Sequence, residues 1–166
     1  MSVSIRAARP EDAPLILELV RELAEYERAA HEVVARAEDF VRDGFGERPL
    51  FHVLLAERGG RAIGFAFYFF AYSTWEGRGV LRLEDLFVEP EERGGGVGLA
   101  LMRALAEEAK RAHCTRFEWQ VLDWNAPAIA FYEKLGATIL PEWRVVRVTG
   151  EALDRLGAGP ARTAGA

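Results

Sequence analysis

The chain has 166 residues, 50% of them hydrophobic, which suits one domain with a core of ordinary size, and its longest apolar run, residues 65–72, is too short to cross a bilayer. The net charge of −5 argues against nucleic acid as a partner, because binding to the phosphate backbone needs an excess of Lys and Arg. A single cysteine, Cys114, excludes an internal disulfide or cysteine metal cluster, and the three histidines show no ligand spacing, so no metal is expected.

The first half of the chain alternates between strand and helix patterns. Residues 3–7 alternate as an opening strand, and residues 13–28 carry apolar side chains at helical spacing. A shorter helix is expected over residues 35–42. Residues 51–57 and 62–72 predict two strands joined through a glycine pair, and the second is apolar on both faces, which indicates burial on both sides. The N-terminus lacks a signal-peptide pattern, so we expect a cytoplasmic protein.

The second half centres on a strand expected over residues 81–88, which alternates so that Leu81, Leu83, Asp85 and Phe87 share one face. A long amphipathic helix follows it.

The rest of the chain continues in short elements. A strand is predicted at residues 116–122, and a short helix with a proline in its first turn ends at Gly136. Residues 143–149 alternate as a last strand, and residues 151–156 predict a final turn of helix. Residues 157–166 are small and unpatterned, which is typical of a disordered tail.

The stretch Arg93-Gly94-Gly95-Gly96-Val97-Gly98 joins the central strand to the long helix. Glycines let the backbone bend and approach a ligand, and the first N–H groups of the helix point outward with the positive end of its dipole. This pattern predicts a cradle for a phosphate or pyrophosphate, with a plain flexible turn as the alternative.

Two common phosphate motifs do not fit this stretch. A Walker loop requires a Lys and a Ser or Thr after its last glycine, whereas Leu99 and Ala100 follow Gly98. The dinucleotide fingerprint has a different glycine spacing and belongs to the first strand of a βαβ unit. The spacing is instead similar to Arg-x-x-Gly-x-Gly, the acyl-CoA pyrophosphate motif of the Gcn5-related N-acetyltransferases (GNAT).

The predicted order of strands, this motif and the segment Trp124-Asn125-x-Pro-x-x-x-Phe131-Tyr132-x-x-x-Gly136 together resemble that superfamily from about residue 3 to 149. The resemblance implies one domain over residues 1–156 with an α/β (α+β) GNAT fold. This fold has a mixed central sheet of about six to seven strands, helices on both faces, and an acyl-CoA site where the central strands splay apart. Several segments, among them residues 64–72 and 81–88, are similar to the diamine acetyltransferase branch, which includes spermidine/spermine and thialysine acetyltransferases.

The resemblance implies which residues hold acetyl-CoA, the co-substrate. The strand backbone would pair with the pantetheine arm and the glycine amides would hold the pyrophosphate. The implied coenzyme-binding residues are Leu86, Phe87, Val88, Arg93, Gly94, Gly95, Gly96, Val97, Gly98, Leu99, Asn125, Ala126, Pro127, Ala128 and Tyr132.

The resemblance also assigns the catalytic roles. Tyr132 would donate a proton to the departing thiolate, and Glu84 would accept one from the amine. Both roles are chemically sensible, because an alkylammonium titrates near ~10.4 and must lose its proton before it attacks, and a phenol near ~10 can protonate a thiolate. Without the resemblance, Tyr132 would be read as a core aromatic and Glu84 as a solvated strand residue.

For the amine, the resemblance implies that Tyr26 and Glu27 bind its distal part, while Glu84 and Asp85 supply negative charge. Position alone would make Tyr26 and Glu27 a packing residue and a solvated carboxylate. Trp75 is either a local apolar plug or a wall of the substrate slot. Polyamine enzymes of this branch carry an acidic residue two positions before that Trp, whereas this chain has Ser73, which favours a shorter diamine or a lysine-like amino acid.

The leading hypothesis is therefore an enzyme that acetylates a primary amine of a small cationic metabolite by direct attack in a ternary complex. Two alternatives stay open: a CoA-binding regulatory module without catalysis, and an acetyltransferase of protein N-termini or lysines. The resemblance also implies a twofold homodimer.

Overall fold

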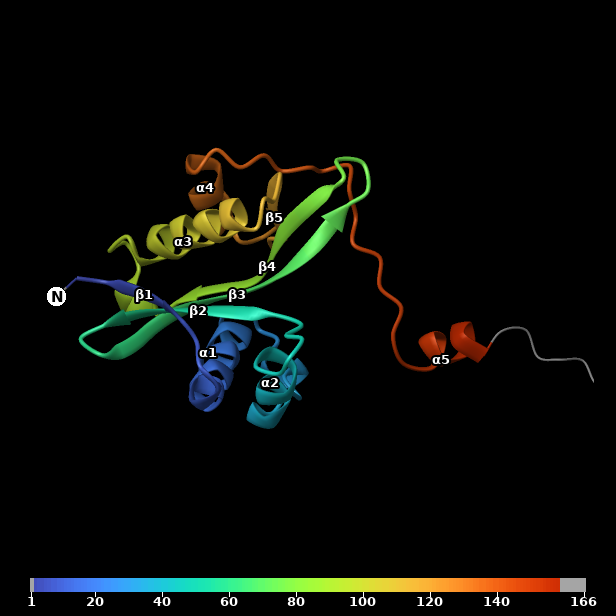
Figure 1. Ribbon diagram of the computed structural model, residues 1–166, viewed down its shortest axis with the longest axis horizontal. Helices are drawn as coiled ribbons and strands as arrows, with labels where there is room; N and C mark the ends of the chain where they lie inside the picture. Colours follow the sequence, from blue (N-terminus) through green and yellow to red (C-terminus); the bar gives the residue numbers. More distant parts are fainter. Residues whose placement is uncertain (1, 159–166) are drawn as a thin grey trace, which may run out of the picture. The chain divides into compact units, whose positions relative to one another are not determined.

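The computed structural model describes residues 2–158 (Figure 1). The chain divides into two compact units, the first ending at Gln120 and the second beginning at Val121. The second unit holds helices α4 (Ala126–Lys134) and α5 (Gly150–Ala158). The predicted tail lies outside the described residues, except for residues 157 and 158, which end α5. Within residues 2–158, no helix combines the length and the apolar content needed to cross a membrane.

The first unit contains a mixed sheet in the order β1-β2-β3-β4-β5. Neighbouring strands are antiparallel up to β4, because short hairpins join β2 to β3 and β3 to β4. β5 pairs with β4 in parallel, because the chain returns through helix α3 before it enters β5. The strands are β1 (Ser4–Ala7), β2 (His52–Arg58), β3 (Arg61–Ser73), β4 (Arg78–Val88) and β5 (Arg116–Trp119).

The predicted sheet of six to seven strands is not confirmed, since the described residues form a sheet of five strands. Residues 143–149, predicted as the last strand, adopt no strand within the described part of the chain. Alternation shows that a segment has one apolar face, but a strand also needs a neighbouring backbone to accept and donate its hydrogen bonds.

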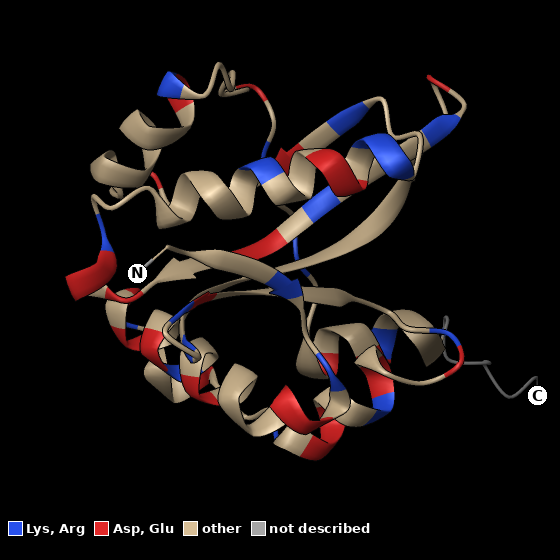
Figure 2. Cartoon of the chain, turned by 60° about the vertical axis from the view of Figure 1, so that its left-hand side comes forward, with Lys and Arg blue, Asp and Glu red and all other residues tan. Residues whose placement is uncertain are grey.

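Helices cover both faces of the sheet, as predicted (Figure 1). Helices α1 (Ala13–Tyr26) and α2 (Ala37–Gly44) lie on one face, and α3 (Val97–Arg111) lies on the other. The apolar stripe of α1 packs against Phe65 and Phe87 of the central strands. Lys and Arg positions, like those of Asp and Glu, occur on both helices and strands (Figure 2).

A β-bulge interrupts the pairing of β3 with β4. Phe67 lies opposite Asp85, whereas the next residue, Tyr68, lies opposite Leu83, so Glu84 is an extra residue in β4. Asp85 and Leu83 therefore point to opposite faces of the sheet, and the prediction that they share one face is wrong. Strict alternation fails at an inserted residue, because every side chain beyond it changes face.

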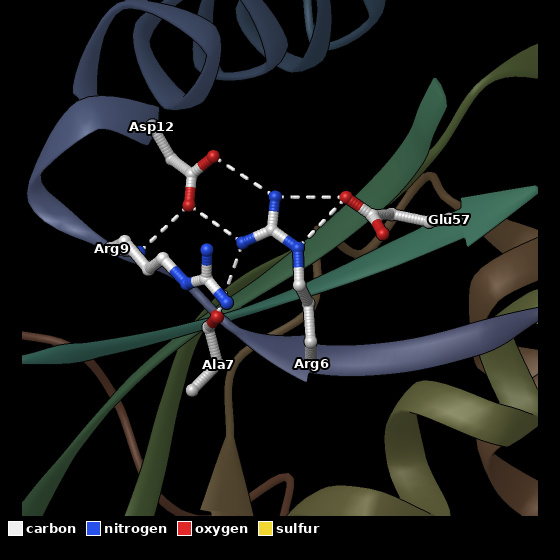
Figure 3. A network of polar contacts seen from close by, with 5 residues as sticks. All are labelled: Arg6, Ala7, Arg9, Asp12 and Glu57. Carbon is white, nitrogen blue, oxygen red and sulfur yellow. Dashed lines mark hydrogen bonds and ion pairs between the residues drawn. The ribbon is translucent and has the colours of Figure 1, made fainter. Parts of the chain in front are cut away.

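The start of α1 is fixed to the edge of the sheet by Arg6 of β1 (Figure 3). The Arg6 guanidinium donates to both carboxylate oxygens of Asp12 at 2.6 and 3.0 Å, and to Glu57 of β2 at 2.8 Å. Asp12 also accepts the backbone N–H of Arg9 at 2.7 Å. The hydrogen bond from Arg6 lowers the pKa of Asp12, so this pair stabilises the fold less as the pH falls through that lowered value.

Gly64 of β3 lies against the backbone of β4, and a Cβ at this position would lie 2.6 Å from the carbonyl oxygen of Phe87. We expect Gly64→Ala to lower the free energy of unfolding by about 1–3 kcal/mol, because the two strands must separate. Urea denaturation measures this change. Gly157→Ala is the control, since nothing lies within 4 Å of its added Cβ. An undiminished free energy of unfolding in Gly64→Ala would contradict the close strand contact.

Candidate active site

The glycine-rich loop between β4 and α3 has the backbone geometry of an anion cradle. Gly94 and Gly96 have φ angles of 77° and 82°, in the left-handed region where residues with side chains are strained. Gly96 is the N-cap of α3, and within the described residues no side chain caps this end of the helix. The first N–H groups of α3 thus have no partner inside the helix. A Cβ at Gly94 or Gly96 would meet no atom within 4 Å, so the loop is open on this side.

Two arginines of the β2–β3 hairpin hold the turn that leads into this cradle. Arg58 pairs with Glu92, and Arg61 pairs with Glu89 at 2.6 Å and with Glu92 at 3.4 Å. Neither arginine is among the site residues predicted from the sequence. The run of carboxylates at residues 89–92 was the available signal, but its partners lie in another hairpin that the linear sequence does not connect to it.

Beside the cradle, β4 leaves its neighbour β5. The parallel pairing of these strands covers Val80 to Leu83 and stops just before the bulge at Glu84. Leu86, Phe87 and Val88 pair with β3 on one side, and within residues 2–158 no strand pairs with them on the other. Their backbone can therefore accept an extended ligand as an added strand, and the ligand's diphosphate end would reach the glycine loop. These residues fit acetyl-CoA.

Three carboxylates gather next to this opening. Glu84 is exposed on the bulge, Asp85 is partly buried beside it, and Glu27 caps the C-terminal end of α1. Burial raises the pKa of Asp85 to about 7, with further contributions from the negative charges of Glu84 and Glu27. Burial also raises the pKa of Glu27. Carboxylates so arranged favour either a shared proton or a bound cation, which suits the ammonium group of an amine.

Arg93, the first residue of the glycine motif, connects these two regions. Its Nε donates to the carbonyl oxygen of Val88 at 2.9 Å. Its guanidinium lies 4.5 Å from the centroid of the Tyr26 ring and 5.7 Å from that of Phe87. Four of the five residues predicted to bind the amine, namely Tyr26, Glu27, Glu84 and Asp85, thus lie around the opening of β4.

The fifth, Trp75, lies in the turn between β3 and β4, at the other end of β4 from the cradle. Its side chain is 90% exposed, which does not fit a local apolar plug. Ser73 in the same turn is buried, and its hydroxyl accepts the backbone N–H of Glu76 at 3.3 Å. Ser73 therefore stabilises the turn.

The remaining predicted residues belong to the second unit. Asn125 is the N-cap of α4, and its side-chain oxygen accepts the N–H of Ala128 at 3.3 Å. Pro127 lies in the first turn, as the sequence predicts. Tyr132 lies in the same helix, with its ring centroid 5.3 Å from that of Phe131.

A mixed sheet whose central strand opens at a bulge, directly beside a glycine cradle at a helix N-terminus, defines a protein that can bind an acyl-CoA thioester in an extended form. The chain belongs to the acetyltransferase (GNAT) family, whose model matches residues 16–137. This confirms the family resemblance of the sequence.

Individual relatives are similar over most of the chain. A thialysine N-epsilon-acetyltransferase of Mus musculus is 42% identical over 166 residues, which cover 93% of this chain and 97% of that protein. The spermidine/spermine N(1)-acetyltransferase-like protein 1 of Homo sapiens is 36% identical over 90% of this chain and 23% of its own length. Among solved structures, the integron cassette protein VCH_CASS6 from the mobile metagenome of V. cholerae has a TM-score of 0.79 and 28% identity, and the match covers 95% of this chain and 98% of that one.

The raised pKa of Asp85 predicts a pH-dependent cost to stability. The folded protein binds the Asp85 proton more tightly than the unfolded chain does. The protonated carboxyl therefore contributes fully to the free energy of unfolding below the ordinary pKa of 3.8, and this contribution is lost as the pH rises to about 7. Asp85→Asn removes the charge. We therefore expect its melting temperature to exceed that of the wild type at pH 8, with a difference that shrinks toward pH 4.

Thermal unfolding followed by circular dichroism across this pH range measures the effect. Asp154→Asn, at an exposed position of α5, is the matched control and should show no such trend. A pH-independent difference between Asp85→Asn and the wild type would contradict the assignment.

Proposed function

We propose that this protein transfers the acetyl group of acetyl-CoA to a primary amine of a small cationic metabolite, by direct attack within a ternary complex. The observation that carries the proposal is the opening of β4 after Leu83, which places a free strand edge and an anion cradle next to three carboxylates. An anionic coenzyme and a cationic amine would meet at this point of the fold.

The coenzyme would lie along Leu86 to Val88, with its diphosphate on the amides of residues 94–99. Acetyl-CoA supplies an activated acetyl group as a thioester. The backbone N–H groups of the open strand edge would hold the thioester carbonyl and stabilise the negative charge that develops on its oxygen.

The carboxylates would prepare the amine. Asp85 and Glu27 would hold its charged groups, and Glu84 would accept the proton that the attacking ammonium must lose. The nitrogen lone pair then forms a bond to the acetyl carbon, the carbon–sulfur bond breaks, and the nitrogen releases its second proton to solvent as the neutral amide forms. From the family resemblance, Tyr132 would return a proton to the departing thiolate. No covalent enzyme intermediate is required.

Two observations support a short diamine or a lysine-like amino acid as the acceptor. The relative of Mus musculus carries the name of an enzyme that acts on thialysine, and it matches nearly the whole chain. Ser73 stands where the polyamine enzymes of the branch have an acidic residue, and its hydroxyl is used within its own turn. One carboxylate fewer weakens the attraction for a long, multiply charged polyamine.

The family resemblance supports a twofold homodimer, and the absence of a signal-peptide pattern supports a cytoplasmic location. Tyr72 near the end of β3 and Trp75 in the following turn are 67% and 90% exposed, and such a contact would cover their rings.

A panel of spermidine, putrescine, ornithine, lysine and thialysine, each incubated with acetyl-CoA and analysed by mass spectrometry, tests the proposed function. We expect acetylated thialysine or another short amine as the main product, and slower acetylation of spermidine. Amine-free reactions measure the background hydrolysis of acetyl-CoA. Absence of product from every amine, despite a thermal shift with CoA, would favour a regulatory module without catalysis. A lysine-containing peptide is added to the panel, and product from this peptide alone would favour an acetyltransferase of protein N-termini or lysines.

Tyr132→Phe tests the proposed proton donor. We expect turnover to fall by a factor of about 10² to 10⁴, as for other general acids, while the affinity for CoA measured by calorimetry stays nearly unchanged. Tyr72→Phe removes a hydroxyl from an exposed position of β3 and is the matched control. Wild-type turnover in Tyr132→Phe would exclude this residue as the acid.

A further inference from the structure

Arg93 opens the glycine motif, but its side chain lies against residues outside the loop. The guanidinium stacks over Tyr26 at 4.5 Å and over Phe87 at 5.7 Å, and Nε donates to the carbonyl oxygen of Val88 at 2.9 Å. These contacts come from the C-terminal end of α1 and from the last residues of β4. Arg93 therefore joins two elements that are distant in sequence.

Each partner of Arg93 is adjacent to a different part of the proposed site. Val88 belongs to the strand edge that would accept the pantetheine arm. Tyr26 directly precedes Glu27, and Phe87 is on the same face of β4 as Asp85, because both lie beyond the bulge and two residues apart. A displacement of the Arg93 backbone would consequently also shift the residues proposed to bind the amine.

Electrostatics agrees with a structural use of this arginine. Burial, and after it the negative charges of Glu84 and Glu27, raise the pKa of Asp85. Its charge lies over aromatic faces, which attract cations through the ring quadrupole. The Arg93 guanidinium is thus held by two aromatic rings and by the carbonyl oxygen of Val88.

We propose that Arg93 is a positioning residue that couples the coenzyme cradle to the amine-binding end of α1, so that the amine binds more tightly once the coenzyme occupies the cradle. This inference rests on the proposed function. A diphosphate held by the amides of residues 94–99 fixes the backbone next to Arg93. The ordered arginine then holds Tyr26 and Glu27 in place before the amine arrives. Coupling of this kind is reciprocal, so the amine must tighten coenzyme binding by the same factor.

Calorimetric titration of thialysine, with and without saturating CoA, tests the proposal without turnover. We expect CoA to tighten amine binding by about fivefold in the wild type, in the range of a partly desolvated cation–π contact. In Arg93→Met this factor should fall to near one, while the affinity for CoA alone stays within about twofold. Arg103→Met, on the exposed face of α3, is the matched control and should keep the wild-type coupling.

A double-mutant cycle with Tyr26→Leu identifies the route of the coupling. The effects of Arg93→Met and Tyr26→Leu on the CoA-dependent factor should be non-additive, since either change breaks the same contact. Additive effects would overturn the proposal. So would an Arg93→Met protein that binds CoA tenfold more weakly and retains its coupling, because Arg93 would then be a direct phosphate ligand.

The failure of the proposed function would be recognised separately. In that case the wild type acetylates no amine of the panel. The Arg93–Tyr26 contact is then tested by thermal unfolding of the wild type, Arg93→Met, Tyr26→Leu and the double variant. The non-additive change in melting temperature should be larger with CoA than without it. Equal non-additivity with and without CoA would show that CoA binding does not strengthen the Arg93–Tyr26 contact.

Discussion

The bulge at Glu84 is the constraint on which the site depends. One additional residue in β4 separates the strand into a part that pairs with β5 and a part that does not. It also moves Asp85 to the face covered by α1, where Glu27 ends the helix. A regular strand would have placed Asp85 beside Leu83 on the opposite face and would have left the carboxylates apart.

The charges around the proposed cradle are compatible with an anionic ligand, although the protein as a whole is acidic. The cradle uses backbone N–H groups and a helix dipole, so it requires few basic side chains and leaves the net charge negative. The paired arginines Arg58 and Arg61 neutralise the acidic turn at residues 89–92, directly before the cradle. Without them, the carboxylates of this turn would repel a diphosphate. The separate carboxylates at the bulge, Glu27, Glu84 and Asp85, would then be available to bind a cation.

Much of this organisation was readable from the linear sequence. The helices over residues 13–26 and 97–111, the strands on either side of the glycine pair, and the helix that begins near Pro127 all follow from local periodicity and turn residues. The glycine-rich loop of the proposed cradle was equally visible, because consecutive glycines and the helix that follows them are local features of the sequence. Such features are determined by neighbours in the chain, and the matching family model confirmed the acetyltransferase resemblance that they indicated.

The sequence by itself determined the type of most elements, the position of the glycine-rich loop at the start of α3, and the family. The tertiary structure decided the face of Asp85, the pairing of Arg58 with Glu92, the stacking of Arg93 on Tyr26, and the absence of a strand at residues 143–149 from the described sheet. Each of these depends on which segments of the folded chain become neighbours. Periodicity reports the environment that a side chain prefers, but a bulge, an ion pair or a strand is completed by a partner elsewhere in the chain.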